Sequence, residues 1–92
     1  PPQLFVASLT SCIAAFATTY CNNAGINSED LSVTLSYDKL ADPGRLGNFK
    51  AVINIPHDPV GQKEKAVIRA SEHCFIHQTM RLSPEVEITL EK

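Results

Sequence analysis

Apolar residues cover nearly every face of the first two dozen positions, a pattern typical of a buried helix. Small alanines fill the faces between larger side chains that recur at helical spacing, namely Leu4, Leu9, Ile13, Phe16 and Tyr20. Proline is favoured in a first helical turn, and glycine after a helix end, so the pattern predicts a helix from about Pro2 to about Asn23, ended by Gly25. Such a helix has to be covered on nearly all sides.

Apolar and polar positions alternate strictly in two later segments, which predicts a β-hairpin. One face of the first run carries Leu31, Val33, Leu35 and Tyr37, and one face of the second carries Phe49, Ala51, Ile53 and Ile55. The sequence Asp42-Pro43-Gly44 between the two runs supplies the residues of a turn. Both strands are therefore expected to bury one face and expose the other.

The rest of the chain predicts a second helix and a last strand. Asp58-Pro59 has the chemistry of an N-cap followed by proline at the first helical position, and Cys74 lies on the inward stripe four residues after Ala70. Ser83-Pro84 interrupts the helical pattern, and a final strand is expected in which Val86, Ile88 and Leu90 alternate with polar residues.

The expected order is α-β-β-α-β, an α+β fold with an antiparallel sheet packed on two helices. Three strands cannot surround a helix that is apolar on all sides. Further strands or a second subunit must supply the remaining cover, and a homodimer is the simplest arrangement. The chain opens with Pro1-Pro2 at a helix edge, so we expect 1–92 to be a single domain that lacks strands preceding this helix.

Composition narrows the classes of function. A chain of 92 residues forms one domain, and its formal net charge of −2 gives no electrostatic reason to expect nucleic acid or an anionic membrane as a partner. The first segment lacks the basic flank of a signal peptide or a membrane span. The odd count of three cysteines fits poorly with paired disulfides and favours a reducing, cytoplasmic compartment.

Cys12 and Cys74 are the residues whose chemistry stands out. Cys12 lies on the inward stripe of the first helix, whereas Cys21, nine residues later, falls on the opposite side and cannot pair with it within one helix. Burial as an inert, small apolar residue is the alternative for both positions. A thiol needs to ionise before it acts as a nucleophile.

The string Cys74-Phe75-Ile76-His77 leaves a metal alternative open. Cys12, Cys74 and His77 could form three ligands of an open zinc site if they converged, but the paired spacing of a closed site is missing. No glycine-rich phosphate loop or other cofactor motif occurs, so no cofactor is expected.

Two stretches resemble the OsmC-like proteins, a family that includes osmotically induced protein C and the organic hydroperoxide resistance proteins. They are the run from Pro2 to Cys12 and the run from Cys74 to Met80, separated by a hairpin and a helix in the same order. The resemblance implies intertwined homodimers with strands preceding the first helix. It also implies that Cys12 attacks a hydroperoxide and becomes a sulfenic acid, that Cys74 closes a disulfide, and that a dithiol reductant reopens it.

The chain departs from this resemblance where the thiol would be activated. The family's peroxidases carry an arginine on an upstream strand and a glutamate near the start of the first motif, where this sequence has Pro2. A buried thiol without a cation ionises poorly, and a helix dipole does not reach a mid-helix position. His77 is the expected assisting group, with His73 as the alternative, because both lie close to Cys74 in the sequence and either could reach the thiols if the fold brings it near.

The sequence therefore predicts a cytoplasmic, dimeric thiol redox protein that reduces organic or small hydroperoxides through Cys12 and Cys74. The alternative is a non-enzymatic dimer that binds a small apolar ligand and in which both cysteines only pack.

Overall fold

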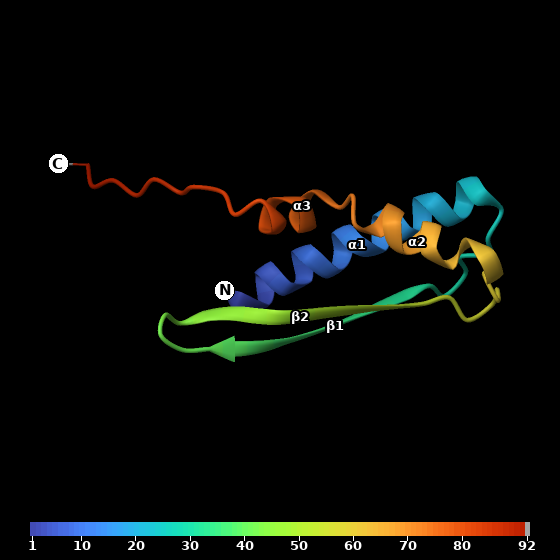
Figure 1. Ribbon diagram of the computed structural model, residues 1–92, viewed down its shortest axis with the longest axis horizontal. Helices are drawn as coiled ribbons and strands as arrows, with labels where there is room; N and C mark the ends of the chain where they lie inside the picture. The colour runs from blue at the N-terminus through green and yellow to red at the C-terminus, as the bar shows by residue number, and fades with distance from the viewer. Residues whose placement is uncertain (92) are drawn as a thin grey trace.

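The computed structural model of the chain describes residues 1–91. A two-stranded antiparallel sheet and two short helices pack along one long helix, which carries the buried stripe shared by both (Figure 1). The elements in order are α1 (Pro2–Ala24), β1 (Ser32–Leu40), β2 (Arg45–Asn54), the 3-10 turn η1 (Gly61–Lys63), α2 (Glu64–Ser71) and α3 (Phe75–Arg81). The α+β fold class predicted from the sequence is confirmed, although the order of elements differs.

Helix α1 begins and ends almost where the sequence predicts. Pro1 precedes its first turn, and Gly25 ends it in the left-handed region at φ 73°, a conformation that glycine adopts without a Cβ clash. The main-chain N–H of Ile26 then donates to the Cys21 carbonyl at 2.8 Å, which satisfies one of the acceptors that a helix end leaves unpaired.

The hairpin follows the predicted alternation. Its pairing runs from Ser32 opposite Asn54 to Leu40 opposite Arg45, with one irregularity between Ser36 and Asp38. The half-buried positions of β1 alternate with exposed ones, so that one face of the sheet packs toward α1 and the other meets solvent.

The core consists of two clusters along a single stripe of α1. Leu9 and Ile13 form the first cluster with Cys74, against which Cys12, Phe16, Phe49 and Met80 pack among others. Cys21 forms the second with Ile26 and Val67. The buried residues of α1 follow one another every four positions, so the buried stripe turns slowly around the helix. It faces α3 near the middle of α1 and α2 near the end of α1. The buried residues are Leu9, Ile13, Ala17 and Cys21.

The remaining faces of α1 are open. Leu4 is 76% exposed near its start, and Phe5 is 37% exposed. By length and composition alone α1 could cross a membrane, a test that core helices and signal sequences also pass. Here it packs against the hairpin, α2 and α3 on one side, while its other side lacks cover from residues 1–91.

The prediction of an N-cap at Asp58 and a first helical residue at Pro59 is wrong. Val60 has a positive φ of 60°, which is incompatible with continuing a helix, and α2 begins only at Glu64 after the 3-10 turn. Asp58 instead joins two loops: its Oδ1 accepts the N–H of Val60 at 2.8 Å and its Oδ2 accepts the N–H of Asn27 at 3.0 Å.

The second predicted helix is interrupted at its C-terminal end. Helix α2 stops at Ser71, and Cys74 has the extended angles φ −50° and ψ 130° before α3 begins at Phe75. The spacing from Ala70 had predicted that Cys74 lies on the inward stripe of the second helix. This prediction is wrong, because α2 ends before Cys74. It occupies the N-cap position of α3, without a side-chain capping hydrogen bond.

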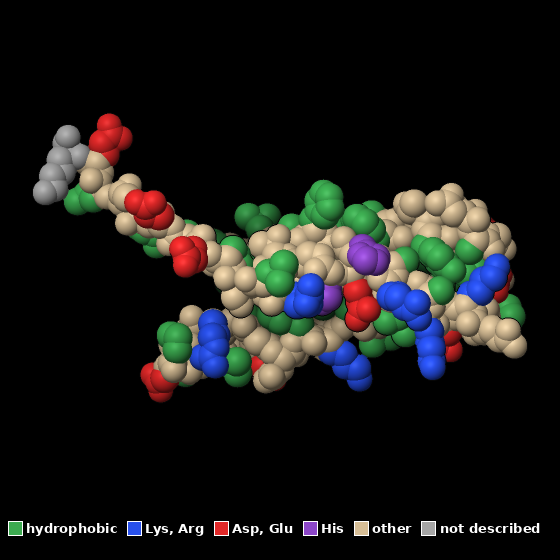
Figure 2. All heavy atoms as spheres, turned by 45° about the horizontal axis from the view of Figure 1, so that its top comes forward, with side chains coloured by type: hydrophobic (Ala, Val, Ile, Leu, Met, Phe, Trp, Pro, Cys, Tyr) green, Lys and Arg blue, Asp and Glu red, His purple; other side chains and the backbone are tan. Residues whose placement is uncertain are grey.

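The predicted last strand does not form within the described chain. Residues 83–91 are extended but pair with neither strand, and this C-terminal tail projects from the end of α3 (Figures 1 and 2). Val86, Ile88 and Leu90 are 77%, 89% and 83% exposed. The alternation that predicted the strand is real, but a strand also needs a neighbouring edge to supply its hydrogen bonds.

The Asp58 junction generates a stability prediction. The pKa of Asp58 is lowered by the main-chain N–H groups of Asn27 and Val60 and by the charge of Lys63. Burial acts in the opposite direction and does not outweigh them. Because the folded-state pKa is depressed, the stabilisation is present above the ordinary aspartate pKa near 4 and is lost as the pH falls through the folded value. Asp58→Ala should lower the free energy of unfolding at pH 7, measured by urea titration, and the difference from the unmodified chain should shrink at pH 2 to 3.

Glu85→Ala is the control for this prediction, because it removes the same charge from an exposed tail residue. An equal loss of stability in both variants, or a difference for Asp58→Ala that does not change with pH, would contradict a role for these two hydrogen bonds.

Candidate active site

Cys12 and Cys74 meet where α3 packs on the middle of α1. Cys12 packs against the cluster of Leu9, Ile13 and Cys74, and both cysteines are free thiols. The cysteines come from opposite ends of the sequence, and the contact between α1 and α3 brings them together. The structure thus places the two sulfurs in one site, as the redox interpretation requires.

The break between α2 and α3 explains how Cys74 reaches this site. Its extended conformation ends one helical run, and its carbonyl then accepts the N–H of Gln78 at 3.0 Å as the first bond of α3. The N–H groups of the first turn have no partner inside their own helix. The N–H groups of Phe75 and Ile76 act to lower the pKa of Cys12, and those of Ile76 and His77 act to lower that of Cys74, although Cys74 makes no side-chain capping hydrogen bond.

The environment of Cys12 lowers its pKa. Burial is the largest single effect and raises the pKa of Cys12. The Cys74 thiol and the N–H groups of Ile76 and Phe75 are hydrogen-bond donors that lower it, and their combined effect exceeds that of burial. The sequence had offered only a nearby histidine as an activating group, because a helix dipole does not act at mid-helix. The structure supplies donors from the first turn of a different helix.

The pKa of Cys74 is shifted in the opposite direction, upward. Burial raises its pKa most, and the hydrogen bond that its thiol donates to Cys12 raises it further, against the N–H groups of His77 and Ile76. Cys12 is consequently the thiol that ionises first, and Cys74 retains its proton.

Exposure separates the two thiols in the same way. Cys74 is fully buried at 0% exposure, whereas Cys12 is half-buried. Cys12 is therefore the more accessible of the two thiols.

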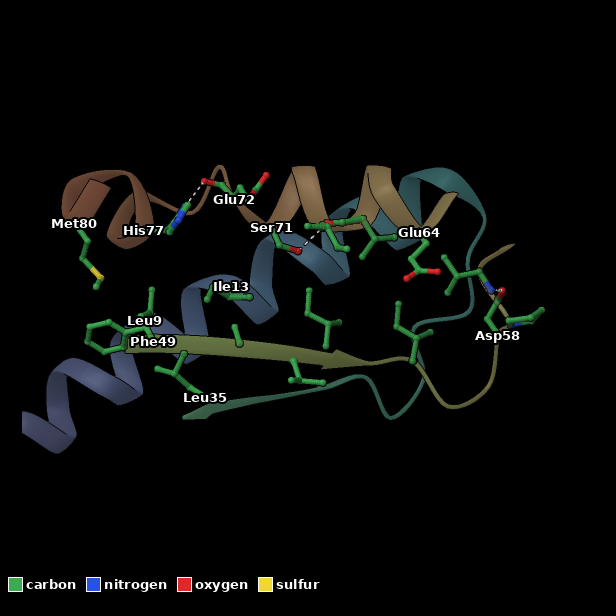
Figure 3. Close-up of a pocket in the computed structure, with 18 residues that line it drawn as sticks. Leu9, Ile13, Leu35, Phe49, Asp58, Glu64, Ser71, Glu72, His77 and Met80 are labelled. Atoms are coloured by element: carbon green, nitrogen blue, oxygen red, sulfur yellow. Dashed lines mark hydrogen bonds between the residues drawn. The ribbon is translucent and has the colours of Figure 1, made fainter. Parts of the chain in front are cut away.

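His77 approaches the pair through its main chain. Its N–H is directed at Cys74, while its ring Nδ1 lies 2.9 Å from the Glu72 carbonyl, to which it donates when protonated at that nitrogen (Figure 3). The expected assistance from the imidazole therefore stays a prediction. The groups that act on the Cys12 pKa are the Cys74 thiol and two main-chain N–H groups.

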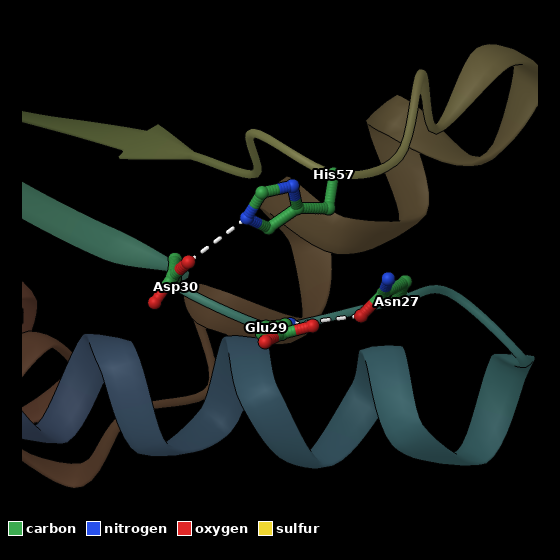
Figure 4. A network of polar contacts seen from close by, with 4 residues as sticks. All are labelled: Asn27, Glu29, Asp30 and His57. Atoms are coloured by element: carbon green, nitrogen blue, oxygen red, sulfur yellow. Dashed lines mark hydrogen bonds and ion pairs between the residues drawn. The ribbon is translucent and has the colours of Figure 1, made fainter.

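The other candidate residues lie elsewhere. Cys21 is fully buried in the second cluster, where burial, and then the charge of Asp58, raises its pKa, as expected for a packed thiol. His57 pairs with Asp30 at 2.8 Å between Nε2 and Oδ2, and this exposed contact joins the loop after β2 to the start of β1 (Figure 4). Among residues 1–91, no three His, Cys, Asp or Glu side chains converge as a metal site would require.

A cavity that sequence reasoning missed lies beside the site. It has a volume of about 620 Å³ between the sheet, α1 and the two short helices, and its walls are mostly apolar (Figure 3). Leu9, Ile13, Phe49 and Met80 line it, with Glu72 and His77 at one side, and neither cysteine contributes to its walls. Alternation in the strands predicted these inward faces, but not that a space would remain between them.

Comparison with known proteins assigns the family. Residues 1–89 match the family described as OsmC-like protein. The chain belongs to the OsmC-like family. No curated protein matches it significantly.

A solved structure shares the fold of this OsmC-like chain. It is the crystal structure of a protein from Psychrobacter arcticus 273-4 described as an osmotic stress induced and detoxification response protein, and it superposes with a TM-score of 0.76 at 18% sequence identity. The match covers 86% of this chain and 58% of that one, so the present OsmC-like chain spans less than two thirds of its length.

The main-chain donors at Cys12 generate a second prediction. Phe75→Pro removes the N–H that faces Cys12 while keeping a residue that is well suited to the first helical position, and Phe75→Ala removes the aromatic ring but keeps the N–H. The Cys12 pKa should be higher in Phe75→Pro than in Phe75→Ala. Alkylation rates measured against pH, with the labelled peptides separated by mass so that each cysteine is read alone, would show this. Equal pKa values would mean that this N–H does not stabilise the thiolate.

Proposed function

We propose that this OsmC-like chain is a thiol-dependent peroxidase that reduces organic or small hydroperoxides. The Cys12 thiolate attacks the terminal peroxide oxygen, the O–O bond breaks, and the alkoxide takes a proton to leave as an alcohol, or as water from hydrogen peroxide. Cys12 is left as a sulfenic acid. The thiol of Cys74 then attacks that sulfur, a disulfide forms, and water leaves with the hydroxyl group and the thiol proton.

The cycle needs a reductant to close. A dithiol attacks the disulfide through a mixed-disulfide intermediate, is itself oxidised to a cyclic disulfide, and returns both protein thiols. Two electrons from the dithiol thus reach the peroxide in each turnover. The proposal requires no metal and no bound cofactor.

One observation carries the proposal: the two sulfurs share a site in which their acidities differ in the required order. The half-buried thiol, Cys12, is the more acidic, and the fully buried thiol, Cys74, keeps the proton that the second step releases.

We further propose that the protein acts as a homodimer in the cytoplasm. The uncovered side of α1 supports the homodimer, since exposed apolar side chains such as Leu4 are stabilised by burial against a second copy. The three free thiols support a reducing compartment.

Brief oxidation tests the chemistry. One equivalent of cumene hydroperoxide should yield a Cys12–Cys74 disulfide, detected by peptide mass spectrometry, and Cys12→Ser should slow peroxide consumption by on the order of 10³-fold or more, as loss of a covalent nucleophile does. Cys74→Ser should instead accumulate a sulfenic acid on Cys12 that a dimedone probe traps.

Cys21→Ala is the matched control, because Cys21 lies in the other core cluster, and it should leave peroxide consumption nearly unchanged. Irreversible oxidation of Cys12 to a sulfonic acid without any disulfide, at a rate no faster than that of a free thiol, would refute the proposal.

The 620 Å³ cavity favours one second candidate, a non-enzymatic protein that binds a small apolar ligand and whose cysteines only pack. In that case a fluorescent apolar probe such as anilinonaphthalene sulfonate should bind the reduced chain, and Ala51→Trp in the cavity wall should weaken probe binding at least about tenfold. Ala41→Trp, in the hairpin turn outside the cavity, is the control. Binding without peroxide-dependent disulfide formation would select this candidate over the peroxidase.

A further inference from the structure

The cavity beside the thiols is a second site that the peroxide chemistry does not use. Its volume of about 620 Å³ lies within the range of roughly 300 to 1,000 Å³ typical of pockets that enclose small organic molecules. Because neither cysteine contributes to its walls, a molecule bound there need not react with the thiols. The chemistry of the walls indicates which molecules would fit.

Most of the wall is apolar, and it is built from the three surfaces that surround the cavity. Helix α1 supplies Leu9 and Ile13, the sheet supplies Phe49 and Ile53, and α2 supplies Val67. Walls of this kind bind a ligand by removing its apolar surface from water. The ligand therefore needs an apolar body.

The ionisable side chains of the wall are predominantly acidic. Three carboxylates line the cavity, those of Asp58, Glu64 and Glu72, and among residues 1–91 no lysine or arginine contributes to it. His77 is the wall residue that can become cationic, and it lies toward the opposite end of the cavity from Glu64 (Figure 3). The end of the cavity near Glu64 is consequently favourable for a positive charge and unfavourable for a negative one.

Glu64 stands on the inward face of α2. Val67 and Ser71 follow it by three and seven positions, so the three side chains share one face of the helix, and both later residues are buried. The carboxylate extends from α2 toward the sheet, over the cavity (Figure 3). An acidic residue in a first turn complements the helix dipole on any face, so the dipole does not explain why this one lies on the inward face.

The Glu64 carboxylate has no cationic partner within residues 1–91. The ion pair of this part of the chain joins His57 to Asp30, away from α2. Lys63, the neighbour of Glu64 in sequence, instead donates from Nζ to the Ala24 carbonyl at 2.7 Å. Glu64 is therefore available to a cation that arrives from solution.

Asp58 is less available than Glu64 at the same end of the cavity. Its two oxygens already accept the main-chain N–H groups of Asn27 and Val60, at 3.0 and 2.8 Å. These bonds hold the carboxylate in the junction between two loops. Its charge still adds to the negative potential near Glu64.

Ser71 adds a buried acceptor to the same wall. It is 5% exposed, and its Oγ donates to the Val67 carbonyl at 2.8 Å. That bond uses the single hydrogen of the hydroxyl group, so the oxygen that lines the cavity keeps its capacity to accept. Along α2 a bound molecule thus meets side-chain acceptors, which match a polar end that donates hydrogen bonds.

We propose that the cavity binds small organic amines, with the apolar body against α1 and the sheet and the ammonium group beside Glu64. This names the ligand class of the second candidate function; it rests on the cavity of that candidate and does not depend on the thiol chemistry. A neutral molecule of the same shape gains only the burial of its apolar body. An anion of the same shape is repelled by the carboxylates, so it binds more weakly rather than not at all.

Three ligands that share one apolar body test the proposal. They are phenylbutylamine, phenylbutanol and phenylbutyrate, each with its phenyl ring at the end of the chain, titrated by calorimetry into the whole reduced chain at pH 7 and low salt. The amine should bind about three- to fivefold more tightly than the alcohol, which is the range of a partly exposed ion pair, and at least about tenfold more tightly than the carboxylate.

Two matched variants identify the carboxylate. Glu64→Gln keeps the size of the side chain, and it should abolish the preference for the amine while leaving the affinity for the alcohol unchanged, which also shows that the cavity is intact. Glu85→Gln makes the same change in the exposed tail outside the cavity and should keep the preference. A preference that survives Glu64→Gln would overturn the role of Glu64.

The contrary results are separable. Equal affinities for the three ligands would overturn the amine proposal and leave a site for apolar ligands standing, whereas no binding of any of them would overturn both. Binding that is lost where sedimentation shows a dimer would mean that a second copy occupies the cavity, which also overturns the proposal. Disulfide formation between Cys12 and Cys74 under peroxide, measured on the same samples, reports on the peroxidase separately from each of these.

Discussion

The packing of the first turn of α3 against the middle of α1 is the contact on which the candidate site depends. It sets Cys74 beside Cys12, and it turns otherwise unpaired N–H groups toward both sulfurs. Neither helix has this property alone. The middle of α1 has no donors to offer, because its N–H groups are used within the helix, and α3 has donors but no exposed thiol.

Two opposing effects act on the Cys12 sulfur. Burial disfavours the thiolate, and this single effect is larger than any one of the three donors, yet their sum reverses it. All three groups that lower the Cys12 pKa among residues 1–91 are neutral hydrogen-bond donors. The same proximity makes Cys74 less acidic, since it is the donor in the shared hydrogen bond. One contact thus differentiates two chemically identical side chains.

Exposed apolar surface is the second feature that organises the molecule. A chain of this length buries a modest share of its surface, and here one side of α1 and the whole C-terminal tail remain outside the core. The two features are related, because the covering of α1 by only a hairpin and two short helices leaves both an open helix face and an unpaired sheet edge.

The sequence by itself determined those features that depend on near neighbours. Helical spacing and Gly25 located α1, strict alternation located the hairpin, and the two motifs around Cys12 and Cys74 indicated the OsmC-like family. Only the tertiary structure decided the rest. Whether Asp58 caps a helix or joins two loops, whether Cys74 lies within a helix or before one, and whether the tail pairs as a strand all depend on contacts between residues distant in sequence. The donors to Cys12 belong to this second group, because they come from a helix more than sixty residues along the chain, and no local pattern records where that helix will pack.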